Sequence, residues 1–171
     1  MVIYLFPTEM EAAPFRSPCP EAEIVISGVG MVATAATLAK LDREGRLGEC
    51  CAVVLAGIAG SYGGSVAVGD VVEVLSERLV ELPKAFYKEY SVEAATTLRG
   101  VVSNTVHRST EACGAEVENM EGATLFAMAV ELGFRAVEIR AVSNIVGEPF
   151  ERWRIGEALE ALATTLLLYK N

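Results

Sequence analysis

Hydrophobic and polar positions follow one another along the chain in a pattern that predicts strands and helices in alternation. Short runs rich in valine, isoleucine and alanine are typical of strands, and most of them end at turn-forming residues. The expected strands are residues 2–6, 24–27, 52–56, 66–75, 101–106 and 136–142. Longer segments with apolar residues at helical spacing predict helices at residues 31–41, 121–132 and 153–169.

Several of the expected strands are apolar throughout, which is typical of strands covered on both faces. With helices between them, they predict a single three-layer α/β domain over residues 1–171, with a mostly parallel or mixed central sheet covered by helices. We expect the third strand to stop at Gly57 and the fourth to be interrupted by a turn or bulge at Gly69-Asp70. The polar stretch 77–97 gives the weakest structural signal.

Composition and charge narrow the range of partners. The chain has 171 residues, of which 52% are hydrophobic, and a formal net charge of −9. A negative surface disfavours nucleic acid and anionic membranes, and no apolar run reaches the roughly 18 residues typical of a membrane span. The short apolar run 2–6 has no basic region before it, so we expect it to be a strand and not a signal peptide. We therefore expect a cytoplasmic protein whose partner is a small molecule.

The cysteines give no metal-site pattern. None of the four forms a C-x-x-C pair, and His107 is the single histidine. The expectation is that the protein has no metal site.

One glycine motif has two interpretations. Residues 28–33 read G-x-G-x-x-A between an expected strand and an expected helix, as in a dinucleotide-binding turn. Such a site would need an acidic residue at the end of the next strand, about 20 residues later. That strand ends in Ala56-Gly57, so we interpret the glycines as a tight turn and expect no nicotinamide or flavin cofactor.

Three other segments place small or polar residues where a parallel sheet binds its ligands. The glycines of residues 57–60 follow one expected strand, and polar residues end the segment 139–144. The third segment, residues 117–123, reads VENMEGA just before a helix. Its Glu121 either favours the positive helix N-terminus or accepts hydrogen bonds from the vicinal hydroxyls of a ribose, with Met120 packed on the sugar.

Six motifs together resemble the nucleoside phosphorylase and nucleosidase superfamily in their order and spacing. They are Thr8-Glu9-Met10-Glu11, Ser27-Gly28-Val29-Gly30, the glycine segment 57–60, Val68-Gly69-Asp70, Asn119-Met120-Glu121-Gly122-Ala123 and Arg140-Ala141-Val142-Ser143-Asn144. Within the superfamily, residues 118–123, Ser143-Asn144 and 152–155 are most similar to the futalosine hydrolases, which act in a route to menaquinone. The similarity covers most of the chain except about residues 77–100, which look shortened relative to the family.

The resemblance implies roles for particular residues. Glu11 matches the family glutamate that polarises the attacking water, and Glu121 matches the acceptor of the ribose hydroxyls. The other implied substrate-binding residues are Asn119 and Met120 in the same motif, and Ile58, Ala59 and Gly60 through backbone contacts. Asn144 stands where adenine-specific nucleosidases carry an aspartate. An amide offers a donor and an acceptor together, which suits a 6-oxopurine such as hypoxanthine.

The resemblance also has implications for the attacking nucleophile and for the oligomeric state. Phosphorolysis needs arginines around a phosphate, but the N-terminal segment offers only Arg16, so we expect hydrolysis. The high apolar content and the habit of the superfamily predict a homodimer. Two alternatives stay open: another purine nucleosidase or phosphorylase, such as a methylthioadenosine/adenosylhomocysteine nucleosidase, or a degenerate nucleoside-binding module without activity.

Overall fold

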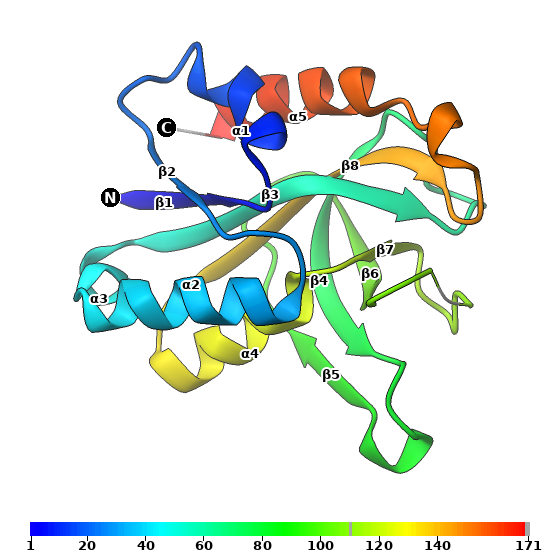
Figure 1. Cartoon of the computed structure of the whole chain (residues 1–171), viewed down its shortest axis with the longest axis horizontal. Helices are drawn as coiled ribbons and strands as arrows, with labels where there is room; N and C mark the ends of the chain where they lie inside the picture. The colour runs from blue at the N-terminus through cyan, green and yellow to red at the C-terminus, as the bar shows by residue number, and fades with distance from the viewer. Residues whose placement is uncertain (110, 170–171) are drawn as a thin grey trace.

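A computed structural model describes residues 1–109 and 111–169, in which a mixed sheet lies between two layers of helices (Figure 1). The strands are β1 Val2–Phe6, β2 Glu23–Ile26, β3 Ala52–Ser61, β4 Val71–Leu79, β5 Lys88–Ser91, β6 Arg99–Thr105, β7 Val117–Asn119 and β8 Ala136–Ile145. The helices are α1 Glu9–Arg16, α2 Met31–Arg43, α3 Arg46–Glu49, α4 Gly122–Leu132 and α5 Ile155–Tyr169, with 3₁₀ turns η1 Lys84–Phe86 and η2 Phe150–Arg152. The predicted three-layer α/β domain is confirmed.

Strand pairing divides the sheet into an open parallel part and a closed part. β2, β1 and β3 pair in parallel, and β3 continues in parallel with β8. Beyond β8 the pairings close into a circuit, because β8 pairs with β4, β4 with β6, β6 with β7, and β7 again with β3. The long strands β3 and β8 therefore belong to both parts.

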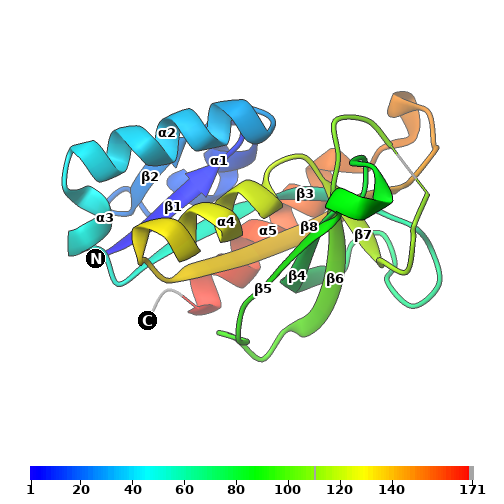
Figure 2. The ribbon, with the colours of Figure 1, turned by 90° about the horizontal axis from the view of Figure 1, so that it is seen from below.

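Each face of the parallel part has its own apolar core. Figure 1 shows α1 and α5 over one face and α2, α3 and α4 over the other, and Figure 2 shows α4 in front of the sheet with α5 behind it. Along β3, Val53 and Leu55 join the α2–α4 core while Val54 and Ala56 join the α1–α5 core, as the two-residue strand period requires. The largest helical contributors are Leu38 and Phe126 on one face and Phe15 and Leu162 on the other.

One element boundary was predicted wrongly in a way that affects the site. β3 does not stop at Gly57 but continues to Ser61, with β8 paired alongside it through Ile145. The predicted loop at residues 57–60 is therefore strand, with a register irregularity between Ala59 and Gly60. Glycine breaks a strand pattern in sequence because it has no side chain to pack, but here neighbouring side chains occupy that space.

Other differences lie at the ends of elements and in the polar stretch. The strand expected at 66–75 begins only at Val71, and Asp70 closes the preceding turn by accepting a hydrogen bond from the Ala67 amide at 2.8 Å. Helix α1 was not predicted. The polar stretch 77–97 contains the end of β4 and the short strand β5, which pair as a hairpin that extends away from the body in Figure 1.

Within the described part of the chain, no helix has the length and apolar character needed to cross a membrane.

Candidate active site

The carboxyl ends of the parallel strands meet at one side of the sheet and form a cavity of about 360 Å³. β1 leads into α1, which carries Glu11, and β3 and β8 end beside each other. All eight residues predicted for the site line this cavity: Glu11, Ile58, Ala59, Gly60, Asn119, Met120, Glu121 and Asn144.

Glu11 is held at the start of α1 by a side-chain cap. Thr8 is the N-cap residue, and its hydroxyl oxygen accepts a hydrogen bond from the Glu11 amide at 3.2 Å. The Glu11 carboxylate turns into the site, where Oε2 accepts from the Thr8 hydroxyl at 2.6 Å and Oε1 from the Ile58 amide at 3.1 Å. The side chain is buried, so its position is fixed from both α1 and β3.

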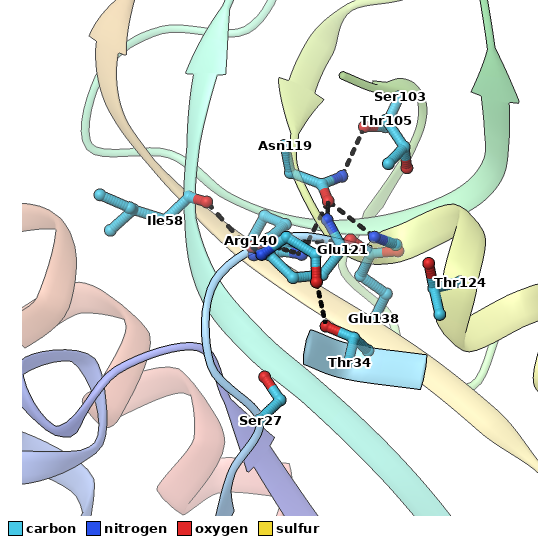
Figure 3. A network of polar contacts seen from close by, with 12 residues as sticks. Ser27, Thr34, Ile58, Ser103, Thr105, Asn119, Glu121, Thr124, Glu138 and Arg140 are labelled. Atoms are coloured by element: carbon cyan, nitrogen blue, oxygen red, sulfur yellow. Dashed lines mark hydrogen bonds and ion pairs between the residues drawn. The ribbon is translucent and has the colours of Figure 1, made fainter. Parts of the chain in front are cut away.

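Arg140 on β8 is the centre of the polar network in Figure 3. Its guanidinium is buried and donates to the Glu121 carboxylate at 3.1 Å, to Asn119 Oδ1 at 2.9 Å and to the Ile58 carbonyl at 3.4 Å. On its other side, Nε donates to Glu138 Oε1 at 2.8 Å. Burial lowers the pKa of Arg140, but the neighbouring carboxylates Glu138 and Glu121 raise it more, so the group stays charged.

Glu121 links three segments that are distant in sequence. Its Oε2 accepts from Arg140, and its Oε1 accepts from the backbone amide of Gly30 at 2.9 Å, at the start of α2. The side chain is buried at the edge of the cavity. A carboxylate has about four lone-pair directions, so two bonds leave capacity to accept hydroxyl groups of a ligand.

Asn119 fixes the backbone that carries Met120 and Glu121. Its Oδ1 accepts from the amides of Glu121 and Gly122, both at 2.8 Å, as well as from Arg140. Its Nδ2 donates to Ser103 and Glu77. Although Asn119 touches the cavity, its amide is engaged by protein groups, which indicates that it holds the motif in place.

Asn144 has a defined amide orientation. The Ser143 hydroxyl donates to Asn144 Oδ1 at 2.8 Å, and Asn144 Nδ2 donates to the Ile145 carbonyl at 3.1 Å. Because an amide nitrogen carries two hydrogens and an amide oxygen two lone pairs, each end keeps one position for a ligand.

Sequence reasoning missed two groups of residues here. Phe150 and Trp153 lie on one wall with their rings tilted against each other and the ring centroids 5.2 Å apart. Trp153 also anchors the segment by donating Nε1–H to the Glu148 carbonyl at 3.2 Å. Arg108 also lines the cavity, whereas the neighbouring His107 does not. Phe150 and Arg108 lie in loops and turns without periodic signal, and Trp153 was expected at the start of a helix that begins only at Ile155.

The second missed group is a buried acidic pair, Glu77 and Glu138, behind Arg140. The sequence did carry a signal for Glu138: it and Arg140 are two residues apart in an otherwise apolar strand, so both side chains point to one covered face. Oppositely charged side chains in that arrangement indicate a buried network.

Among residues 1–109 and 111–169, no group of three histidine, cysteine, aspartate or glutamate side chains is arranged to hold a metal ion.

Comparison with known proteins places the chain in a family. It is 28% identical to futalosine hydrolase of Thermus thermophilus over 208 residues, which covers 95% of this chain and 92% of the relative. Its fold is that of the 5′-methylthioadenosine/S-adenosylhomocysteine nucleosidase of Helicobacter pylori (TM-score 0.83, 12% identity, 98% of this chain and 96% of that one). Futalosine hydrolase of H. pylori is similar as well (TM-score 0.80, 13% identity, 97% and 95% covered).

The family assignment itself comes from the sequence model described as the Phosphorylase superfamily, which matches residues 75–168. This range includes β8, α4 and the motif around Glu121, and it is more than half of the chain. The protein is a member of the Phosphorylase superfamily.

Proposed function

We propose that the protein is a nucleosidase that hydrolyses the N-glycosidic bond of futalosine and releases hypoxanthine, in a route to menaquinone. The observation that carries the proposal is the presence of two fixed, buried carboxylates, Glu11 and Glu121, in one cavity of nucleoside size. The relative from T. thermophilus supports the choice of substrate. The reaction would take place in the cytoplasm and need no cofactor.

The two carboxylates have separate tasks in this proposal. Glu121 accepts hydrogen bonds from the ribose hydroxyls, and Met120 packs on the sugar face. Glu11 polarises a water molecule, whose oxygen bonds to the anomeric carbon as the bond from that carbon to the purine nitrogen breaks. The electron pair leaves with the purine. The proton lost by the water passes by way of Glu11 to solvent, and the purine takes up one proton from solvent. Because the sugar is oxocarbenium-like in the transition state, fixed carboxylates beside it lower the barrier.

Asn144 is proposed to recognise the leaving base through hydrogen bonds. Ser143 and Ile145 hold the amide so that one donor position and one acceptor position remain. A 6-oxopurine presents complementary groups, whereas the amide has no proton to give to a departing adenine at neutral pH. This favours hypoxanthine as the base and weighs against a methylthioadenosine substrate.

The hydrogen bonds of the arginines favour water over phosphate as the nucleophile. All the Arg140 donors described above are directed to Glu138, Glu121, Asn119 and Ile58. Arg16 is paired with Glu9 on the outside of α1. Of the described arginines, Arg108 is the other one that lines the cavity, and a phosphate site is built from several such groups.

The proposal also includes a homodimer that covers the mouth of the cavity. Met10, Val29 and Phe150 line the cavity, yet they are 55%, 53% and 65% exposed. Val32, in the first turn of α2, is 81% exposed. An apolar surface of this kind at the edge of a binding site is typical of a surface that another subunit covers.

The substrate assignment is tested by offering the protein futalosine, inosine and methylthioadenosine, each with and without phosphate, and measuring free base. We expect hypoxanthine from futalosine at a rate that phosphate does not change. Adenine as the main product would refute the proposed role of Asn144 in base recognition, and a requirement for phosphate would refute hydrolysis.

The role of Glu11 is tested by Glu11→Gln, which keeps the size of the side chain and its bond from the Ile58 amide but weakens it as a base. Turnover should fall by about 10²–10⁴-fold, the range for loss of a general base, while folding is nearly unchanged. Circular dichroism melting serves as the control for folding. If turnover stays near that of the wild type, Glu11 does not activate the water.

The dimer is tested by light scattering on an active sample. We expect twice the chain mass of 18.2 kDa, with an interface above about 1,000 Å² in total. A mass of one chain at every concentration, with full activity, would show that a single subunit forms the whole site.

A further inference from the structure

Two carboxyl groups lie side by side beneath the start of α4, where neither touches the cavity. Glu77 on β4 and Glu138 on β8 are both fully buried. Residue 122 is a glycine, and a Cβ atom there would lie 2.3 Å from Glu77 Oε1 and 2.4 Å from Glu138 Oε2. Both oxygens therefore lie in the space that a side chain at residue 122 would fill, so the two carboxyl groups are close neighbours.

Their hydrogen bonds leave one oxygen without a donor. Glu77 accepts from the Thr105 hydroxyl at 2.6 Å and from Asn119 Nδ2, and Glu138 Oε1 accepts from Arg140 Nε. Glu138 Oε2 accepts no hydrogen bond from any amide, amine or hydroxyl group of the described residues. A buried carboxylate oxygen without a donor is costly, so the group next to it is expected to supply one.

The charged groups around the pair cannot balance the negative charge that Glu77 and Glu138 would carry if both were ionised. The titratable groups that face the pair are Arg140 on β8, Glu121 at the start of α4, and Glu11 on α1, which acts on Arg140 at longer range. Arg140 is the single cation among them, and it is also bonded to Glu121. With one positive charge for four carboxyl groups, the network is stabilised when one of the four is neutral.

We propose that Glu77 and Glu138 share one proton, carried by Glu77 and donated to Glu138 Oε2, and that this pair positions Arg140 for the reaction. Glu138 then stays ionised and satisfied at both oxygens, and it holds the guanidinium by Nε. The neighbouring Nη2 group is thereby directed to Asn119 and Glu121. Glu77 and Glu138 are thus positioning residues that act through Arg140 and do not touch substrate.

The electrostatics agree with this assignment of the proton. Burial, and then the negative charge of Glu138, raise the pKa of Glu77 well above its usual range. Burial also raises the pKa of Glu138, but Arg140 opposes that shift through its charge and its hydrogen bond. The proton is therefore retained on Glu77, the member of the pair without a bonded cation.

The pH dependence follows from the direction of the shift. A carboxyl group with a raised pKa in the folded state holds its proton there while the unfolded chain has lost it. The pair's contribution to stability is complete below the ordinary carboxyl pKa and is lost as the pH rises through the raised value. Above that value both groups are ionised, and their repulsion disturbs Arg140.

The test compares Glu77→Gln, Glu138→Gln and Glu73→Gln in the full chain. Gln at 77 can donate to Glu138 in place of the shared proton, but the donating nitrogen no longer accepts from Asn119 Nδ2. We therefore expect kcat/KM to fall less than in Glu138→Gln, with its alkaline decline removed. Gln at 138 removes the anion from Arg140 Nε, so kcat should fall by more than about tenfold. Glu73 is the matched control, because it is a buried glutamate of β4 whose carboxylate accepts from Ala95 and Thr96 and not from Arg140. Its variant should keep the wild-type pH profile even if it is less stable.

Infrared difference spectroscopy gives a readout that does not rest on the proposed function. At neutral pH we expect a protonated-carboxyl C=O band in the wild type and in Glu73→Gln, and none in Glu77→Gln. Absence of that band from the wild type, or its persistence in Glu77→Gln, would overturn the proposal. So would equal losses of activity in the variants at 77 and 138. Only the kinetic measurements depend on the proposed function. If the protein is inactive on nucleosides, the infrared band still tests whether Glu77 carries the shared proton.

Discussion

The structure depends on one buried cation, the guanidinium of Arg140. It is fully desolvated, and it contacts the element that carries each key group of the site: Glu121 before α4, Asn119 on β7, Ile58 on β3 and Glu138 on its own strand. Removing one partner from such a network leaves an uncompensated buried charge, which typically costs about 3–5 kcal/mol. The same bonds that stabilise the core therefore also set the geometry of the cavity.

Two glycines make room for this network on either side of Arg140. At Gly57, a Cβ atom would lie 2.7 Å from Arg140 Nη1 and 2.8 Å from Glu11 Oε1, so glycine allows Arg140 and Glu11 to approach the same point of β3. At Gly122, the missing Cβ makes room for Glu77 and Glu138. The glycines thus serve as spaces for charged side chains and not as turns, and their replacement by alanine would force the network apart.

The fold class could be predicted from the sequence because it depends on local order, whereas the expected site residues came mainly from the resemblance to the superfamily. Apolar runs between helical segments indicate a covered sheet, and the carboxyl ends of its parallel strands necessarily meet, which gathers Glu11, Gly60 and Asn144. The extension of β3 could not be predicted, because the side chains that fill the space at Gly57 come from α1 and β8. The partner of Glu138 was missed for the same reason: Glu77 lies in a polar stretch whose strand is recognised only from its pairing with β6, β8 and β5. The local sequence pattern therefore indicates the helices and strands, whereas the contacts between buried charged side chains depend on long-range strand pairing.

The central claim is that Arg140 holds the catalytic geometry through directed hydrogen bonds and not merely through its charge. Arg140→Lys keeps the charge but cannot reach Glu138, Glu121, Asn119 and Ile58 at once, since an ammonium group has three donors on a single atom. The measurement is kcat/KM for hypoxanthine release from futalosine, taken at a temperature where circular dichroism shows the variant folded. We predict a loss of at least about tenfold, equivalent to about 1.4 kcal/mol of transition-state stabilisation. A folded Arg140→Lys variant with wild-type kcat/KM would contradict the account.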